Sequence, residues 1–518
     1  MVVGSGSAGA VVASRLSEDP AVSVLLVEAG GSSRNMNVQI PAAFAKQFKG
    51  KLDWDYETEP EPYLDNRRIY HPRGKMLGGC SGNNAMIYIR GNRADYDSWA
   101  DGGAKGWSYD EVLPYFKKME NNSRGADAFH GAGGPMHIQD LRTPTPLTGH
   151  LIDAAVTVGI PRTNDFNGAE QLGVGYNQVN HKDGRRWTTW DAYLAPAKKR
   201  ANLTIWSGTQ ARKVMLEGNR AVGLEVQRQG IVQTVRASRE VVLSAGAFGT
   251  PHLLMLSGIG PAEHLREHGI NVVIDNANVG SHMMDHPMYL VNNETSMKGT
   301  LAEAESPKQL IKYLTQKRGM LSSNVGEASA FFHTRSGDAA PYMQFIFAPG
   351  FFWNHGFDTH PTPAFGIGCS MVGAQSTGEV RLKNADPLSK PSVLFNYFSA
   401  PEDMDAMVAG IERAREVIAQ ASREAGVGKE LHPGGQVQTR TELEAEIRRS
   451  VEHTYHPSCT ARMGSEADGV IDSALRVHGI SGLRVADASA FPTITHGNTH
   501  TPTVMVGEKA ADLIKEAR

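Results

Sequence analysis

The stretch Met1-Val-Val-Gly4-Ser-Gly6-Ser-Ala-Gly9-Ala-Val-Val-Ala-Ser-Arg-Leu16 opens the chain, and the apolar run Val22-Ser-Val-Leu-Leu-Val27 follows it. This order predicts a buried strand, a glycine turn, a helix and a second strand, which together form a unit that binds a dinucleotide. Gly4 makes the tight turn, Gly6 lets the backbone approach a pyrophosphate, and Gly9 lets the helix pack closely on the strand. The opening residues therefore predict a nucleotide-binding domain.

Glu28 ends the second apolar run, 19 residues after Gly9. At the tip of that strand a carboxylate can accept hydrogen bonds from an adenosine ribose, so we expect an ADP-binding half-site. The alternative is an ordinary strand-helix-strand unit without a nucleotide, because a glycine motif alone is weak evidence. Only three residues precede Gly4, which is short for a strand and consistent with a trimmed N-terminus.

The composition favours a small-molecule partner. A chain of 518 residues is long enough for two domains, and its net charge of −3 gives no reason to expect nucleic acid or an anionic membrane as a partner. Three cysteines are too few for a disulfide framework and suit a reducing compartment. No apolar stretch reaches transmembrane length and no leader pattern precedes the first strand, so we expect a cytoplasmic protein without a membrane partner.

A second glycine-rich stretch lies between residues 72 and 85. Gly74, Gly78, Gly79 and Gly82 alternate there with Ser81, Asn83 and Asn84, directly before the apolar run Ala85-Met-Ile-Tyr-Ile89. A loop with this much exposed backbone can bind an anion or the polar edge of a ring through its NH groups. An ordinary surface loop would not need so many glycines.

Seven motifs together resemble the glucose-methanol-choline (GMC) oxidoreductase family. They are Gly4-Ser-Gly-Ser-Ala-Gly9, Pro72-Arg-Gly-Lys-Met-Leu-Gly-Gly-Cys-Ser81, Arg90-Gly-Asn-Arg-Ala-Asp-Tyr-Asp-Ser-Trp99, Gly246-Ala-Phe-Gly-Thr-Pro-His-Leu-Leu-Met-Leu-Ser-Gly-Ile-Gly260, Asn278-Val-Gly-Ser-His-Met-Met-Asp-His-Pro287, Tyr455-His-Pro-Ser-Cys-Thr460 and Asp487-Ala-Ser-Ala-Phe-Pro-Thr493. They cover almost the whole chain in the family's order. The resemblance implies FAD as cofactor, a primary alcohol as substrate, its aldehyde as product, and O2 or another electron acceptor.

The resemblance also implies an α/β (α+β overall) fold with two domains. A Rossmann-like FAD-binding domain would comprise residues 1–145, 190–300 and 454–518, and a substrate-binding domain with an antiparallel sheet and helices would comprise residues 146–189 and 301–453. The FAD-binding residues implied are Gly4, Gly6, Ser7, Ala8, Gly9, Glu28, Gly78, Gly79, Ser81, Asn83, Asn84, Ala211, Asp487, Ala488 and Thr501. Asn83 stands where the choline-oxidising branch has a histidine bonded to the flavin, so we expect non-covalent FAD.

Two histidines, His456 and His500, occupy the family's catalytic positions, where the first is histidine and the second histidine or asparagine. Hydride removal from an alcohol carbon is easier when a neutral imidazole takes the hydroxyl proton and a second donor holds the resulting oxyanion. Thr501 as N-cap and Pro502 as first helical residue would place His500 at a positive helix end, which disfavours an imidazolium.

For the other histidines near these motifs, a structural role is the simpler interpretation. They are His282, His286, His453, His478 and His496. No metal site is indicated, because His453 and His456 lack the further spaced ligands that a closed site needs.

Alternation of apolar with polar residues, and continuous apolar runs, predict several further helices and strands. We expect a hairpin of 202–206 with 221–226, a buried strand within 239–246, strands at 343–348 and 378–382, and helices near 107–119 and 404–418.

Two features leave two interpretations each, and a third concerns the cavity entrance. Phe351, Phe352 and Trp353 either line a pocket or anchor a loop, and Glu327 either contacts substrate or is structural or solvated. Trp187 and Trp190 replace a more usual small-residue stretch, which favours a narrowed cavity entrance.

Three rival functions stay open. A nicotinamide dehydrogenase would share only the first glycine motif. A hydroxynitrile lyase of the same fold would keep FAD without redox turnover. An FAD-binding module without activity would have no use for the histidine pair.

Overall fold

A computed structural model describes residues 1–335 and 337–517. Its first layer is a sheet of five parallel strands in the order β11-β2-β1-β15-β26. Their bounds are β11 (Leu203–Trp206), β2 (Val24–Val27), β1 (Val2–Val3), β15 (Val241–Leu243) and β26 (Leu483–Val485). The apolar side chains of β1 and β15 are buried, as is usual for strands covered on both faces.

The predicted strand-turn-helix-strand unit is confirmed, with α1 (Gly9–Leu16) after the glycine turn. Gly4 has a φ of +92°, and a Cβ there would lie 2.3 Å from the Ser244 carbonyl oxygen. A Cβ on Gly9 would lie 2.0 Å from the Gly4 carbonyl oxygen. Only glycine fits these two positions, because the backbone approaches too closely for any side chain.

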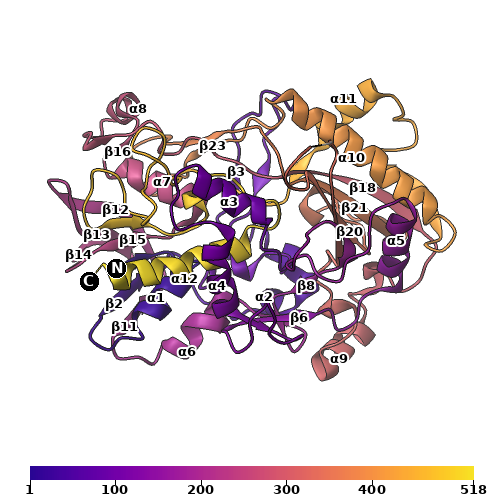
Figure 1. Cartoon of the computed structure of the whole chain (residues 1–518), viewed down its shortest axis with the longest axis horizontal. Helices are drawn as coiled ribbons and strands as arrows, with labels where there is room; N and C mark the ends of the chain where they lie inside the picture. Colours follow the sequence, from indigo (N-terminus) through magenta and orange to yellow (C-terminus); the bar gives the residue numbers. More distant parts are fainter. Residues whose placement is uncertain (336, 518) are drawn as a thin grey trace.

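The last helix packs beside the first, so the two ends of the chain meet (Figure 1). This helix is α12 (His500–Glu516). Arg15 donates from Nη2 to Oε1 of the fully buried Glu508 at 2.8 Å, and the Tyr193 hydroxyl donates to the same oxygen at 2.9 Å. These bonds hold helix α12, whose first residue is His500, against the nucleotide-binding layer.

The predicted hairpin of 202–206 with 221–226 is wrong. Residues 203–206 form β11, which pairs in parallel with β2. Residues 221–226 lie in β13 (Arg220–Arg228), which pairs with β12 (Thr209–Glu217) and β14 (Ile231–Arg236) in a separate antiparallel sheet. Alternation shows that a segment is a strand, but it does not show which strand is its partner.

The second large layer is an antiparallel sheet in the order β24-β18-β21-β20-β19-β7, with β25 also paired to β18. Its strands are β24 (Val427–His432), β18 (Pro287–Thr295), β21 (Ala364–Met371), β20 (Met343–Ala348), β19 (Ala328–Phe332), β7 (Gly173–Tyr176) and β25 (Glu452–His453). Helices α10 (Pro401–Gln420) and α5 (Pro146–Thr157) lie against it (Figure 1). The opposite face is thereby left to line a cavity.

Several predicted elements are confirmed. The 343–348 strand is β20, the 404–418 helix lies within α10, the 107–119 helix is α4 (Tyr109–Met119), and the buried strand within 239–246 is β15. The 378–382 strand is β22 (Glu379–Arg381), paired with β23 (Ser392–Leu394).

The domain boundaries stay a prediction. One strand, β18, lies within the range 190–300 assigned to the FAD-binding domain but pairs in the antiparallel sheet.

The remaining helices and strands lie outside these two sheets. The remaining helices are α2 (Met36–Gln39), α3 (Arg93–Asp101), α6 (Ala195–Ala197), α7 (Gly246–Leu256), α8 (Ala262–Glu267), α9 (Pro307–Gln316) and α11 (Arg440–Ser450). The remaining strands are β3 (Tyr56–Glu57), β4 (Tyr70–His71), β5 (Glu120–Asn122), β6 (Met136–Asp140), β8 (Gln178–Val179), β9 (His181–Lys182), β10 (Arg185–Arg186), β16 (Ile259–Gly260) and β17 (Ile274–Asp275). Within the described residues, no helix combines the length and apolarity needed to cross a membrane.

Candidate active site

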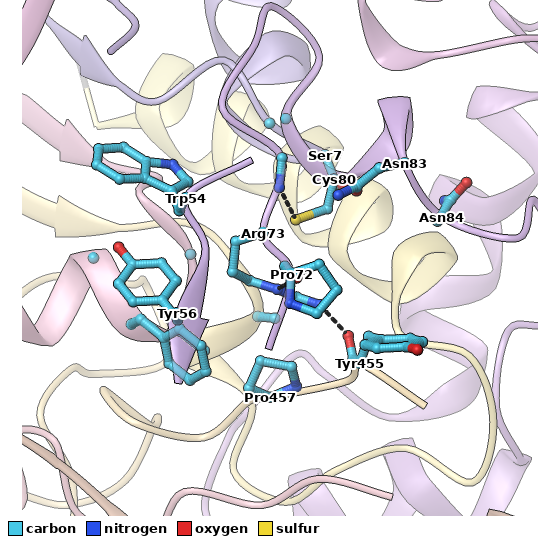
Figure 2. A pocket seen from close by; sticks show the side chains of 18 of the residues that line it. Ser7, Trp54, Tyr56, Pro72, Arg73, Cys80, Asn83, Asn84, Tyr455 and Pro457 are labelled. Atoms are coloured by element: carbon cyan, nitrogen blue, oxygen red, sulfur yellow. Dashed lines mark hydrogen bonds between the residues drawn. The ribbon is translucent and has the colours of Figure 1, made fainter. Parts of the chain in front are cut away.

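One cavity extends from the glycine turn of the parallel sheet to the inner face of the antiparallel sheet. Gly6 and Glu28 line one end, and Met288 of β18 and Ile346 of β20 line the other. Figure 2 shows Arg73 in the middle of this cavity, with its guanidinium directed at the Tyr455 carbonyl group. The cavity therefore has a nucleotide end, a polar middle and an apolar end.

The two predicted glycine loops meet at the nucleotide end. Gly79 has a φ of +51°, and a Cβ there would lie 2.7 Å from the Gly6 Cα. The predicted cofactor residues that line the cavity are Gly4, Gly6, Ser7, Ala8, Glu28, Gly79, Asn83, Asn84, Ala211, Asp487 and Ala488. Four others, Gly9, Gly78, Ser81 and Thr501, lie outside the lining. The two loops thus form a cradle of backbone at this end, and their close approach excludes a side chain at Gly79.

Glu28 is buried at the end of β2 and is largely satisfied by the protein itself. Its Oε2 accepts from the Ser5 backbone NH at 2.8 Å and from the Ser5 hydroxyl at 2.7 Å, and its Oε1 accepts from the Gly30 NH at 2.7 Å. Burial raises the pKa of the Glu28 carboxyl. A carboxylate accepts about four hydrogen bonds, so one position remains for a ligand in the cavity.

His456 presents one ring nitrogen to the cavity and is held by the other. Its Nδ1 lies 2.9 Å from His286 Nδ1 and 3.0 Å from Thr454 Oγ1, while its Nε2 lies 3.3 Å from Asn498 Nδ2. An amide NH can only donate, so Nε2 is the acceptor and Nδ1 carries the proton. Burial, together with the charge of Arg73, lowers the pKa of His456 to about 3, so the ring is neutral at pH 7.

His500 is a second neutral imidazole that lines the cavity. Its Nδ1 lies 2.8 Å from Ser7 Oγ, while its buried Nε2 has no hydrogen-bond partner in the described part of the chain. Burial, together with the charge of Arg186, lowers the pKa of His500 to about 4. If the Ser7 hydroxyl donates to Nδ1, then Nε2 carries the ring proton as a donor.

The prediction of Thr501 as the N-cap of the last helix is wrong. Helix α12 begins at His500, so the N-cap is Thr499 and Pro502 is the third helical residue. Proline is tolerated throughout the first turn because the NH that it lacks has no intrahelical partner there. The Thr-Pro pair therefore marked the start of the helix but not its first residue.

Asp285 and His286 support His456 from the side away from the cavity. Asp285 Oδ1 accepts from the His286 NH at 2.8 Å and from the His456 NH at 2.7 Å. Its Oδ2 accepts from the Tyr397 hydroxyl at 2.8 Å. Sequence analysis missed the contacts of Asn498 and His286 with His456, because no spacing rule relates residues that lie 42 and 170 positions away along the chain.

A buried cluster beside this site resembles a metal site only in composition. The ligand atoms of His71, Asp285 and His453 lie within 4.8 Å of one another. The two imidazole rings stack with their centroids 4.0 Å apart and 9° between their planes. Their lone pairs lie in these nearly parallel planes, so they do not point at one common metal ion. His453 Nδ1 also accepts from the Tyr455 NH at 3.2 Å and Nε2 lies 3.1 Å from the Tyr70 carbonyl oxygen. The cluster is therefore a hydrogen-bonded support.

Of the three aromatic residues at 351–353, one lines the cavity and two do not. Phe352 lines the cavity and stacks on Phe44 with ring centroids 6.0 Å apart. Phe351 and Trp353 do not line it, and Trp353 stacks on His432 at 3.5 Å.

Glu327 is structural, and the tryptophans do not narrow the cavity. Oε2 of the fully buried Glu327 accepts from the hydroxyls of Thr145 and Thr148. Trp187 and Trp190 do not line the cavity, and Trp187 Nε1 donates to the Pro135 carbonyl oxygen at 2.9 Å. The expectation of a narrowed entrance is therefore wrong.

Comparison with known proteins agrees with this geometry. The N-terminal and C-terminal GMC oxidoreductase family models match residues 1–288 and 374–507. The chain is 43% identical to an uncharacterized GMC-type oxidoreductase of Mycobacterium bovis, over 99% of this chain and 98% of the relative. It is 41% identical to an oxygen-dependent choline dehydrogenase of Sinorhizobium fredii, over 99% and 95%.

A solved structure shares the fold over its full length. Pyridoxine 4-oxidase from Mesorbium loti superposes with a TM-score of 0.91 at 31% identity, covering 99% of this chain and 98% of that one. The fold is thus the GMC fold, with a parallel FAD-binding sheet and an antiparallel substrate-domain sheet. The chain therefore belongs to the GMC oxidoreductase family and is a flavin oxidoreductase that acts on CH–OH groups.

Proposed function

We propose that the protein oxidises a primary alcohol to its aldehyde with non-covalently bound FAD, using His456 as base and His500 as hydrogen-bond donor. The observation that carries this proposal is the pair of neutral imidazoles on one cavity, with the His456 Nε2 beside an amide NH and the His500 Nε2 without a hydrogen-bond partner in the described part of the chain. A lone pair on His456 Nε2, taken over by the substrate from Asn498 Nδ2 at 3.3 Å, and an NH on His500 Nε2 would suit the removal of a hydroxyl proton and the binding of the resulting oxyanion.

The nucleotide end fits FAD. Family membership implies this cofactor, and the cavity at this end is lined by Gly6 and Gly79, whose close approach requires bare backbone at Gly79. We assign the pyrophosphate to this cradle at the start of α1, and the ribose to Glu28. When bound, FAD supplies the acceptor for the hydride that leaves the alcohol carbon.

Non-covalent binding is proposed from Asn83. This residue lines the cavity in the second glycine loop, and its amide has no nucleophilic atom that could bond to the flavin ring.

The two histidines divide the work on the hydroxyl group. His456 Nε2 takes the proton, while the Nδ1 proton stays directed at His286 and Thr454. His500 Nε2 donates to the oxygen, and the Ser7 hydroxyl keeps His500 in the required tautomer. Because the two rings act on one oxygen, their titrations are coupled and the base is assigned by geometry.

Anaerobic mixing of the yellow holoenzyme with a panel of primary alcohols tests the proposal. Bleaching of the flavin by at least one alcohol is expected, whereas a hydroxynitrile lyase would keep its colour. Colourless purified protein would contradict the proposal outright. Peroxide formation, measured beside dye reduction, then shows whether O2 or another acceptor takes the electrons.

A further inference from the structure

We propose that the substrate is a neutral alcohol with an apolar body, and that the site selects against quaternary ammonium alcohols. This inference rests on the proposed function, since it concerns the body of the molecule whose hydroxyl group reaches His456. It also predicts a substrate different from the one in the name of the choline dehydrogenases that the chain resembles.

The apolar end of the cavity would surround the body of the substrate. The antiparallel sheet contributes Met288 and Leu290 from β18, Ile346 and Ala348 from β20, and Gly368 from β21. Facing segments add Phe44, Phe48, Val325 and Phe352. Such a surface binds hydrocarbon and aromatic groups by removing them from water.

No carboxylate faces this end within the described residues. The acidic side chains that line the cavity are Glu28 and Asp487, which follow strands β2 and β26 of the parallel sheet. Both are engaged, and Asp487 Oδ2 accepts from the Gly246 NH at 2.8 Å and from the Thr250 hydroxyl at 2.6 Å. A cationic body would therefore lie in apolar surroundings without a counterion, which is unfavourable.

The permanent charge nearest the middle of the cavity is positive. Arg73 lines the cavity and donates to the carbonyl oxygens of Pro72 and Tyr455, both at 2.6 Å (Figure 2). Within the described residues its guanidinium forms no ion pair with a carboxylate, and burial together with its charge lowers the pKa of His456. Arg73 would repel a cationic substrate at the place where its hydroxyl group must bind.

Two features that favour a cation are weaker. Asp285 is negative but lies behind His456, outside the cavity lining, and its oxygens accept from two backbone NH groups and from Tyr397. The aromatic rings of Phe44 and Phe352 could attract an ammonium group by cation-π interaction, but they bind a neutral apolar group equally without a desolvation cost.

Two alcohols of the same shape test the inference directly. Choline and 3,3-dimethylbutan-1-ol differ only in the central atom, which is a charged nitrogen in the first and a neutral carbon in the second. Binding to the holoenzyme is measured by calorimetry, and kcat/KM is measured by flavin reduction. We expect tighter binding and at least about a tenfold higher kcat/KM for the neutral alcohol. Equal or better values for choline would overturn the inference.

The calorimetric binding measurement distinguishes failure of this inference from failure of the proposed function. If no alcohol of the panel, these two included, reduces the flavin, the proposed function fails, while the binding preference still decides the substrate class. Tighter binding of the neutral alcohol would support the inference, and tighter binding of choline would overturn it.

A matched pair of variants locates the selectivity. Ile346 is half-buried on β20 and lines the cavity, so Ile346→Glu places a carboxylate at the apolar end and Ile346→Gln places a neutral side chain of similar size there. The ratio of kcat/KM for choline to kcat/KM for 3,3-dimethylbutan-1-ol should be at least about tenfold higher in the glutamate variant than in the glutamine variant. An identical ratio in both variants would contradict the assignment of this end to the substrate body.

Discussion

His286 is predicted to set the tautomer of His456 without touching the substrate. Its Nδ1 lies 2.9 Å from His456 Nδ1 and can accept the proton that His456 Nδ1 carries. Thr454 Oγ1, at 3.0 Å, can accept the same proton. His286→Leu removes one of these two acceptors, and a hydrogen bond is worth about 0.5–1.5 kcal/mol, or about 2–12-fold. His286→Asn has nearly the shape of leucine but offers a carbonyl oxygen to the same proton. The leucine variant should therefore lose about two- to twelvefold in the rate of flavin reduction, and the asparagine variant should recover most of that loss.

Anaerobic rapid mixing of each variant with a saturating alcohol measures this rate directly. KM should change little, because His286 does not line the cavity. The pH profile gives a second measurement: the loss in the leucine variant should persist at all pH values well above the pKa of His456, which lies at about 3. Equal rates for the leucine and asparagine variants would refute the idea that an acceptor at this position matters.

The remaining predictions concern the cofactor and the oxyanion. Glu28→Ala should weaken FAD binding by about 1–3 kcal/mol, because the Ser5 and ribose donors lose their acceptor; complete FAD retention after extended dialysis would count against this. Acid precipitation should release all the yellow colour, and colour kept in the washed pellet would contradict the argument from Asn83. His500→Asn should keep far more activity than His500→Ala, since its amide NH replaces the lost donor, and equal rates for the two would exclude a donor role.

The nucleotide-binding half of the fold was predictable because its signals are local. Gly4 and Gly9 occupy positions where a Cβ would overlap the backbone, and such positions admit only glycine. The partner of β11 was not predictable, because alternation carries no information about the neighbouring strand.

Within the site, His456 and His500 were found through a family resemblance. Their supporting residues depend on contacts between distant segments. Asn498 and His286 reach His456 only after the two sheets have packed together, and the charge of Arg73 acts on His456 through space. Protonation states therefore needed the structure, since burial sets them.

The most direct test of the central claim is the rate of anaerobic flavin reduction in His456→Ala. Loss of a general base usually costs about 10²–10⁴-fold, so we predict a rate at least about a hundredfold below wild type, with FAD still bound. Because the pKa of His456 is lowered to about 3, the wild-type rate should not fall between pH 8 and pH 6, where an ordinary histidine would become protonated. Near wild-type reduction of the flavin in His456→Ala would show that His456 is not the base.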